Sequence, residues 1–449
     1  MNSAPPGFRP YLLSRAVSTA GTLVATVAVP VLVYQMTGSA AWTSAAAATG
    51  ALPYLLFGLL AGAVADRLDR RRLMVACDML TALALASVPA AWALGSLTPA
   101  HVLAASFAVQ TLYVFFDAAN FGALPALVGR DRLTESYARV YGTTTAVELV
   151  VPALAGLAVA VWAPAPLVAL NALSALASAA LLRAITVPLS HPRRGGAARG
   201  VRTLVEEVRE GLGFLWREPT VRTLTLVGAT HSAASGAWLA MLVPWADRTL
   251  GVAPSGDPRL AALFSCWGVG ALAASVLAPR LAGVLGAPRL ALGALAVSLL
   301  CGVMVVLSTH WLWAAVCAAL WGAAYSVVVI NAITYRQRIS PDHLQSRVST
   351  TARMLSWGVG QPVGAALAGA VAVTAWGPRG GLAAGLAVLA LGVVVAWASP
   401  LRAGAVRGPG PGRGGGPRRG GGGGGGAGGG WGGRRRGDAG RRADRARRR

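Results

Sequence analysis

The chain has 449 residues, of which 55% are hydrophobic and only 12% are charged, and its mean hydropathy is +0.57. A soluble domain carries roughly 25% charged residues, so this composition excludes an ordinary soluble protein. A membrane-spanning helix needs about 20 apolar residues, and the hydrophobic residues would fill about twelve such helices. The composition therefore predicts an all-α polytopic membrane protein.

The net charge of +24 comes from arginine alone, because no lysine occurs in the sequence. A phosphate-binding loop of the Gly-x-x-x-x-Gly-Lys-Ser/Thr type requires lysine, which excludes a nucleotide-hydrolysing domain of that type. The four cysteines stand singly in apolar segments and predict neither a disulfide framework nor a zinc site. We therefore expect no enzyme, no metal and no cofactor, with an ion gradient as the energy source.

Long apolar runs bounded by charge, proline or glycine predict twelve spans. They are residues 11–36, 41–64, 73–95, 100–125, 138–161, 165–182, 221–246, 258–282, 287–307, 311–333, 351–375 and 380–399. The gap between the two sets of six has apolar residues at helical spacing from Leu204 to Trp216, which predicts an amphipathic helix on the membrane surface. The predicted domains are an N-terminal bundle (1–187), a cytoplasmic linker (188–220), a C-terminal bundle (221–399) and a tail (400–449).

Arginine placement predicts the orientation, since cytoplasmic loops carry the excess of positive charge. With both termini in the cytoplasm, 23 arginines of residues 1–399 fall on the cytoplasmic side, against Arg248, Arg259 and Arg379 outside. Similar features also recur at offsets of 210 to 213 residues, including Pro152 with Pro362 and Arg67 with Arg280. The recurrence predicts two homologous halves with a substrate site between them.

The most specific motif is Gly62-Ala-Val-Ala-Asp66-Arg67-Leu-Asp-Arg70-Arg71, between the second and third spans. A small residue lets helices approach closely, and a carboxylate among guanidiniums can form and break ion pairs between conformations. The motif resembles the signature loop of the major facilitator superfamily, with Asp69 in the place of its second glycine. The resemblance implies two pseudo-symmetric six-helix bundles.

Further segments are similar to the branch of that superfamily with enterobactin-exporter-like and macrolide-efflux proteins. They include Val29 to Tyr34, Phe115 to Ala119, Asn171 to Ser174 and Gly211 to Trp216. The resemblance implies export of small amphipathic molecules in exchange for protons, from a multi-pass position in a bacterial plasma membrane. It also implies that Asp117, in the fourth span, is a partner of the loop arginines in a cytoplasmic gate. The alternatives are a solvated charge cluster for the loop and a satisfied helix-end carboxylate for Asp117.

Two groups are candidates for proton coupling. Glu148 lies about 15 Å into the fifth span, near the midplane, where a charged group is expensive and marks function. His231, about ten residues into the seventh span, has a side chain that titrates near neutral pH. The alternative for Glu148 is a carboxylate paired with a neighbouring helix, and the alternative for His231 is a hydrogen bond between helices.

Several other positions have structural interpretations. Arg15 and Asp78 lie near cytoplasmic helix ends and predict a structural pair between the first and third spans, and Pro152 predicts a bend in the fifth. Asn171 and Asn331 are expected to make interhelical hydrogen bonds or to line a substrate cavity. The aromatic residues that could line it are Tyr34, Tyr54, Tyr113, Trp238 and Tyr325, with interfacial anchoring or packing as the alternative.

The last 50 residues contain 21 glycines and 14 arginines, so they cannot form a core and are predicted to be disordered. Attraction to anionic lipid is favoured over nucleic-acid binding for this tail. The sequence as a whole predicts a monomeric secondary exporter that works by alternating access on a small-molecule substrate. The alternatives are a receptor of the same fold that recruits a partner through its tail, and an importer.

Overall fold

Long helices joined by short loops make up the computed structural model, which describes residues 6–129, 132–190, 201–339, 348 and 351–402. No strand occurs in these ranges. The helices are α1 (Phe8–Thr37), α2 (Ala40–Arg67), α3 (Arg70–Ala93), α4 (Pro99–Val128), α5 (Leu133–Val161), α6 (Pro164–Arg183), α7 (Val201–Arg217), α8 (Pro219–Leu250), α9 (Pro258–Leu285), α10 (Ala287–Leu307), α11 (Trp311–Ile339), the π-helix η1 (Met354–Val359), α13 (Gly360–Ala372) and α14 (Gly377–Ala398). The all-α prediction is confirmed, and the predicted tail lies outside the described residues beyond Arg402.

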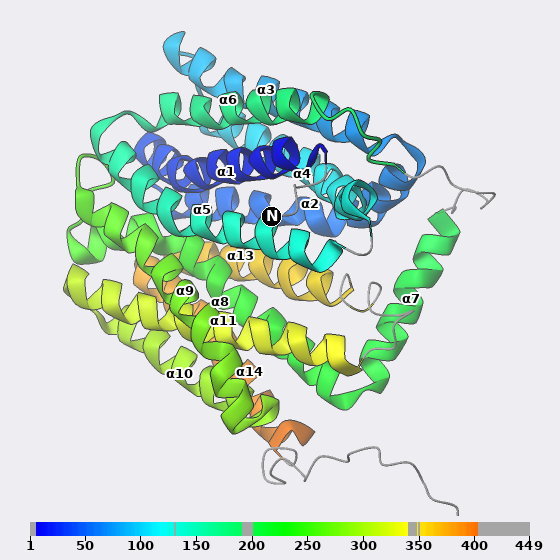
Figure 1. Ribbon diagram of the computed structural model, residues 1–449. Coiled ribbons are helices and arrows are strands. Elements are labelled where there is room, and N and C mark those ends of the chain that lie inside the picture. The colour runs from blue at the N-terminus through cyan, green and yellow to red at the C-terminus, as the bar shows by residue number, and fades with distance from the viewer. Residues whose placement is uncertain (1–5, 130–131, 191–200, 340–347, 349–350, 403–449) are drawn as a thin grey trace, which may run out of the picture. The chain divides into compact units, whose positions relative to one another are not determined.

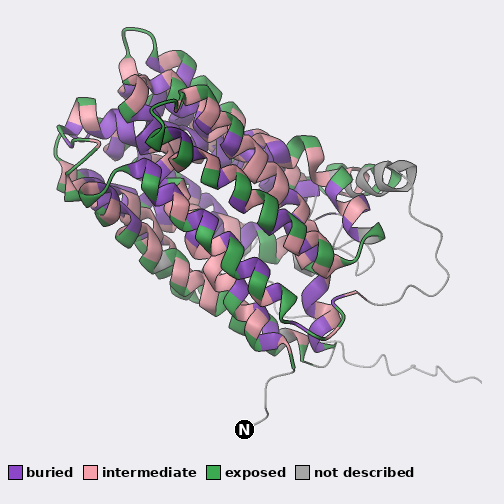
Figure 2. Cartoon of the chain, turned by 90° about the horizontal axis from the view of Figure 1, so that it is seen from above, coloured by how far each residue is buried: buried purple, intermediate pink, exposed green. Residues whose placement is uncertain are grey.

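Ten of the described helices are long and apolar enough to cross a bilayer. They match ten of the predicted spans, while the other two, 41–64 and 351–375, coincide with α2 and with η1 followed by α13. The count of twelve spans and the cytoplasmic position of both termini stay predictions. Large apolar side chains on the surface, such as Leu83, Leu307 and Val394, are each more than half exposed. In Figure 2 such exposed positions follow the outer sides of the helices, where a bilayer would surround them.

Local signals explain where the helices begin and end. The carboxylate of Asp69 accepts a hydrogen bond from the backbone N–H of Arg72 (2.9 Å) and caps α3, while Thr98 caps α4 in the same way. Gly38 and Gly251 follow α1 and α8 with φ of 60° and 62°, a left-handed conformation that suits glycine at a helix C-terminus. The short loops therefore follow from turn residues at fixed places.

The helices form two halves whose packing repeats. In the first half α1 packs against α6 and α5, and α4 packs against α2 and α3; in the second half α8 packs against α14 and α13, and α11 packs against α9 and α10. Each contact of the first set has its counterpart six spans later in the second. Figure 1 shows the first set in its upper part and the second set in its lower part. The packing agrees with the repeat predicted from the sequence.

Two helix pairs dominate the contact between the halves, α2 with α13 and α5 with α9, with a smaller contribution from α2 with α8. Close approach requires small residues here: a Cβ on Gly156 of α5 would overlap Ala261 of α9, and a Cβ on Gly369 of α13 would lie 2.6 Å from Cβ of Ser44. Both approaches lie toward the end of the protein that carries the loops 38–39 and 251–257. We call this the opposite end, and the end with the loop 68–69 the basic end.

The linker helix α7 lies at the basic end, at the right of Figure 1. Its Leu215 is fully buried in a small cluster with Val221, Val348 and Ala352, which attaches the end of α7 to the second half. Trp216, next to it, is 54% exposed. The helix covers the amphipathic segment predicted from Leu204 to Trp216, and its contact with a membrane surface stays a prediction.

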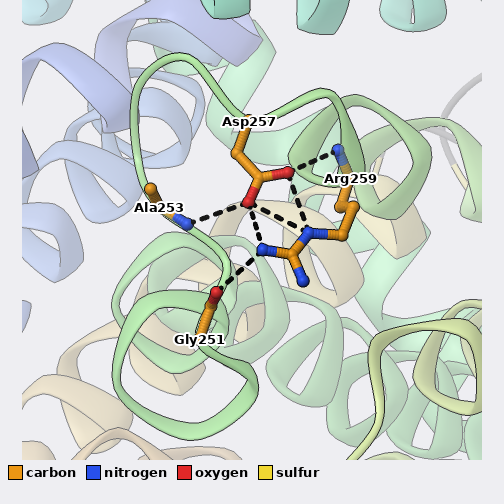
Figure 3. A network of polar contacts seen from close by, with 4 residues as sticks. All are labelled: Gly251, Ala253, Asp257 and Arg259. Carbon is orange, nitrogen blue, oxygen red and sulfur yellow. Dashed lines mark hydrogen bonds and ion pairs between the residues drawn. The ribbon is translucent and has the colours of Figure 1, made fainter.

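A compact polar network fixes the loop between α8 and α9, as Figure 3 shows. The Asp257 carboxylate accepts hydrogen bonds from the backbone N–H groups of Ala253 and Arg259 and from the Arg259 guanidinium, which also donates to the carbonyl oxygen of Gly251 (3.0 Å). These hydrogen bonds, that from the Arg259 side chain above all, hold the pKa of Asp257 below its ordinary value. Asp257 is thus both the N-cap of α9 and the organiser of this loop.

Replacing Asp257 by alanine is expected to lower the thermal midpoint of the purified protein at pH 7, because loss of an N-cap costs about 1 kcal/mol. A carboxylate whose pKa is depressed by folding stabilises the folded state above its unfolded pKa, about 3.9. That contribution is lost as the pH falls through the lower folded pKa. Thermal unfolding in detergent at pH 7 and pH 3 should therefore give a difference between wild type and variant that shrinks at pH 3. An equal difference at both pH values would contradict the electrostatic part of this role.

Candidate functional site

A cavity of about 370 Å³ lies between the two halves. Its wall combines small and apolar side chains from α1 and α2, such as Val29 and Ala47, with polar groups from α4 and α6. The second half contributes Leu239 of α8 and residues of η1 and α13, including Trp357 and Gln361. A mostly apolar wall with a few placed polar groups is typical of a small-molecule site.

The charged groups of the cavity wall form a pair that joins the halves. Asp117 of α4 lies 3.6 Å from the Arg353 guanidinium, measured from Oδ2 to a terminal nitrogen, and also accepts a hydrogen bond from the Tyr54 hydroxyl of α2. The side chains of Asp117 and Arg353 are 26% and 58% exposed. The two opposite charges therefore compensate each other, and both side chains stay accessible. A solute that enters the cavity could compete for either charge.

Arg353 stands directly before the π-helix η1, which also brings Trp357 and Gly358 into the wall. A π-helical turn shifts the side chains that follow it around the helix axis and is frequent at functional sites. On the facing side of the cavity, the Gln110 side chain of α4 donates to the carbonyl oxygen of Gly50 in α2 (2.6 Å). Gln110, Arg353 and Trp357 were not predicted from the sequence as cavity residues, although an amide inside an apolar span and an arginine at the start of one are visible signals.

The predicted gate loop is arranged differently from the expectation. Asp117 pairs with Arg353 and not with a loop arginine, because the Arg70 and Arg71 guanidiniums donate to the carbonyl oxygens of Gly122 (2.9 Å) and Ile185 (2.5 Å). These bonds tie the loop to α4 and to the end of α6, within the first half. The pairing of Asp117 with the loop arginines in a cytoplasmic gate stays a prediction, since Asp117 pairs with Arg353 in this conformation.

The motif also contains Gly62, Asp66 and Arg67. A Cβ added to Gly62 would meet open space, so the close helix approach expected there is not present in this conformation. Arg67 is exposed at the end of α2, and the side chain of Asp66 lies outside the described residues. The gating role of this loop stays a prediction.

The predicted pair of Arg15 and Asp78 is not a direct ion pair in this conformation, although the charge of Arg15 acts on the Asp78 carboxylate. The Arg15 guanidinium lies over the ring of Phe116, 5.5 Å from its centroid, where a cation is attracted by the face of the ring. Asp78 is 5% exposed, and its Oδ2 has no hydrogen-bond partner. Because the Arg15 guanidinium stacks on Phe116 of α4, it donates no hydrogen bond to Oδ2 of Asp78.

The two candidates for proton coupling lie outside the cavity wall. Glu148 is an exposed residue of α5, whose backbone oxygen faces Gly268 of α9. His231 is buried in the second half, with its Nε2 2.6 Å from the Ser298 hydroxyl of α10 and its ring against Tyr325 of α11. The geometry of His231 matches the interhelical alternative, and the coupling role of Glu148 stays a prediction. Pro152 lies inside α5, as expected from its place in the fifth span.

The aromatic and amide candidates separate into three places. Tyr113, Tyr54 and Asn171 line the cavity. Trp238 and Tyr325 belong to an aromatic cluster inside the second half, in which Trp267 stacks on Trp238 and contacts Tyr325. Asn331 is buried on α11. Packing within the second half thus describes Trp238 and Tyr325 better than a place in the cavity wall.

Tyr34 instead belongs to a set of contacts that closes the space between the halves at the opposite end. Its hydroxyl donates to Oδ2 of Asp247 in α8 (2.7 Å), and Arg248 donates to the carbonyl oxygen of Gly38 (2.7 Å). The Gln35 amide donates to the carbonyl oxygen of Pro254 (3.1 Å) in the loop organised by Asp257. The three bonds join α1 to α8 and to the loop that follows it, so in this conformation the cavity is separated from the opposite end.

Comparison with known proteins gives consistent matches. The model of the Major Facilitator Superfamily matches residues 11–356. The multidrug efflux pump Tap of Mycolicibacterium fortuitum is 30% identical over 407 residues, which are 87% of this chain and 95% of that protein. The enterobactin exporter EntS of Escherichia coli is 27% identical over 398 residues, covering 87% and 91%. Macrolide efflux protein A of Streptococcus pyogenes is 27% identical over 220 residues, about half of each chain.

Solved structures resemble the fold. A bacterial homologue of the human lysosomal transporter Spinster superposes with a TM-score of 0.69 at 13% identity, over 87% of this chain and 96% of that one. The nucleoside transporter NupG superposes with a TM-score of 0.68 at 12% identity, over 89% and 99%. At these identities the likeness concerns the fold alone, and it extends over nearly all the described helices.

Proposed function

Because the chain belongs to the Major Facilitator Superfamily, we propose that it exports small amphipathic molecules from the cell in exchange for protons. It is a multi-pass transporter of the bacterial plasma membrane and not an enzyme. The observation that carries the proposal is the cavity between the halves, with a mostly apolar wall and one ion pair across it. Drug, macrolide and siderophore exporters among its relatives support outward movement of such molecules.

Alternating access supplies the mechanism. The halves meet along α2 with α13 and α5 with α9, and rocking about these contacts would open one end of the cavity while closing the other. The bonds of Tyr34, Gln35 and Arg248 close the opposite end in the conformation described above. Substrate entering from the basic end would reach Asp117 and Arg353, and its binding would alter the contact between the halves there.

A proton gradient would make the cycle directional, because a ligand shifts a conformational equilibrium only through different affinities for the two states. A proton that binds more tightly in the state open to the outside, and leaves in the state open to the cytoplasm, would drive export. Proton coupling therefore requires a carboxylate or histidine whose surroundings change between the two states. Glu148 and His231 are the candidates predicted from the sequence.

The function is tested by expressing the full chain in an efflux-deficient bacterium and measuring retention of ethidium, erythromycin and a catecholate siderophore. We expect lower retention of at least one compound than in cells with an empty vector, and recovery of retention on adding a protonophore. The Glu148→Gln variant tests that carboxylate, with Glu135→Gln, an exposed residue paired with Arg139, as the matched control. Unchanged retention of all three compounds by wild type would contradict the proposed export. Export that persists with the protonophore would contradict the proton coupling.

A further inference from the structure

Asp78 is a buried carboxylate that the mechanism above does not use. It lies in α3, eight residues beyond Arg70, which places it about 12 Å along the helix from the basic end. It is 5% exposed, and Oδ2 is a fully buried oxygen without a hydrogen-bond partner. Among the described carboxylates, only Asp78 has a fully buried oxygen that accepts no hydrogen bond. An ionised carboxylate is expensive at such a place unless it is paired.

Few charged or titratable groups face Asp78 from the elements packed around it. Those of α4 have other partners, since His101 lies against Ser87 and Asp117 pairs with Arg353. From α6 the Ser178 hydroxyl faces it, and the one charged residue of α6, Arg183, stands at the last position of that helix. From α1 the Arg15 guanidinium faces it without direct contact, since it lies over Phe116. On α3 itself the nearest titratable group is the neighbouring Cys77 thiol. Among the described residues, Arg15 is therefore the one cation that faces the carboxylate, and its guanidinium lies over Phe116 instead of contacting Asp78.

Arg15 also connects this region to the cavity. Its guanidinium lies near the hydroxyl of Tyr113 of α4, which lines the cavity one helical turn from Asp117. An arginine placed between two carboxylates can be attracted to either, depending on which of them is ionised. Asp117 in turn pairs with Arg353 of the second half. Through Arg15, a change of charge at Asp78 can thus alter the electrostatic surroundings of the Asp117–Arg353 pair between the halves.

A polar stripe on α6 leads from the cavity toward Asp78. Asn171 lines the cavity, Ser174 donates to the carbonyl oxygen (2.8 Å) of Asn171, and the Ser178 hydroxyl lies 3.0 Å from that of Ser14 in α1. The spacing of three and then four residues places all three side chains on one face of the helix, the face against α1. Successive members lie about 4.5 and 6 Å apart along the axis, gaps that a single bridging water spans.

We propose that Asp78 is the proton-binding group of this transporter, and that its proton exchanges with the cavity along the stripe Asn171, Ser174 and Ser178. The inference rests on the proposed function and names the residue that couples the proton. The step is a plain ionisation: the carboxylic acid releases a proton to cavity water and becomes a carboxylate, and the reverse step reloads it. On ionisation Arg15 leaves Phe116 and Tyr113 for Asp78, which alters the surroundings of Asp117. On protonation Arg15 returns to the position seen here.

Infrared difference spectroscopy of the purified full-length protein between pH 9 and pH 5 tests proton binding without a substrate. We expect the band of a protonated buried carboxyl group in wild type and in Glu135→Gln, and its loss in Asp78→Asn. Asp78→Glu should retain a band at a shifted frequency, because it keeps the carboxyl group. An unchanged band in a folded Asp78→Asn protein would overturn the proposal.

Transport in proteoliposomes gives the second measurement, with whichever of the three test compounds wild type exports. For Asp78→Asn we expect at least a tenfold loss of transport driven by a pH gradient, while exchange of labelled for unlabelled compound, which needs no net proton movement, stays within about twofold of wild type. The exchange activity also shows that the variant is folded. Gradient-driven transport by Asp78→Asn at the wild-type rate would overturn the proposal. Failure of the proposed function looks different: wild type would then show no gradient-driven transport at all, and the infrared band would still decide whether Asp78 binds a proton.

Discussion

Replacing Gly364 by valine is expected to reduce strongly the accumulation of folded protein in the membrane. Gly364 lies in α13 where this helix crosses α8, and a Cβ at this position would overlap the carbonyl group of Ala233. The atom that would be struck is backbone, so the clash cannot be relieved by a side-chain rotation. Overpacking of a well-packed interior costs typically 1–3 kcal/mol and occasionally more, against a total stability of about 5–15 kcal/mol.

The same contact contains further glycines, which makes relief by a local shift harder. A Cβ on Gly360 would overlap the carbonyl oxygen of Ala229, and one on Gly236 of α8 would overlap that of Gln361. Moving α13 outward to accommodate valine would open these contacts as well. Gly364→Ala, with a smaller side chain but the same Cβ, is expected to lower the thermal midpoint and still allow some folding.

The measurement is the fluorescence size-exclusion profile of a fusion protein in detergent, with Gly142→Val as the matched control. Gly142 is an exposed residue of α5, and a Cβ there would meet open space. The control should give a wild-type peak, because valine is a better helix former than glycine at a site with room. A wild-type peak for Gly364→Val would mean that α8 and α13 do not approach as closely as described above.

The crossing of α8 and α13 also illustrates what the sequence could predict. Apolar runs and their bounding residues predict where the helices begin and end, because a helix in a bilayer must satisfy its own backbone and so follows local composition. The spacing of Gly360 and Gly364, four residues apart, is a known signal of close helix packing and could have predicted this crossing. The partner surface on α8 could not be predicted, since it depends on the register of two helices more than 100 residues apart.

The site was harder to predict than the fold for the same reason. Tyr113 and Asn171 were expected in a cavity wall and line it, but Arg353 was not singled out, because nothing near it in the sequence points to Asp117. Arg15 and Asp78 lie near one end of the first half, as expected, but the Arg15 guanidinium lies over Phe116 and not in direct contact with the carboxylate. The depth of a side chain in the membrane can be predicted from the sequence. Which of two nearby partners that side chain contacts depends on the packing of the helices.

Oxidation of a Leu55→Cys, Gly358→Cys double variant is expected to stop transport, because it would fasten the two halves together beside the cavity. Leu55 belongs to α2 and Gly358 to η1, and a Cβ added to Gly358 would lie 3.8 Å from Cβ of Leu55. Disulfides have a mean Cβ separation of about 3.8 Å, so the bond should form without moving either helix. The four native cysteines are buried and free, and should not compete for the bond.

Transport of the identified compound is measured in proteoliposomes after mild oxidation and again after reduction. If the halves rock about their interface, α2 and η1 must change their separation during each cycle, since they meet close to the cavity that has to open and close. The oxidised double variant should then fall to the level of empty liposomes and recover on reduction, while each single-cysteine variant stays active under both conditions. Full activity of a protein shown to be cross-linked would place the pivot of the motion at this contact. The opening would then have to come from elsewhere, with the bonds of Tyr34 and Arg248 at the opposite end as the parts left to move.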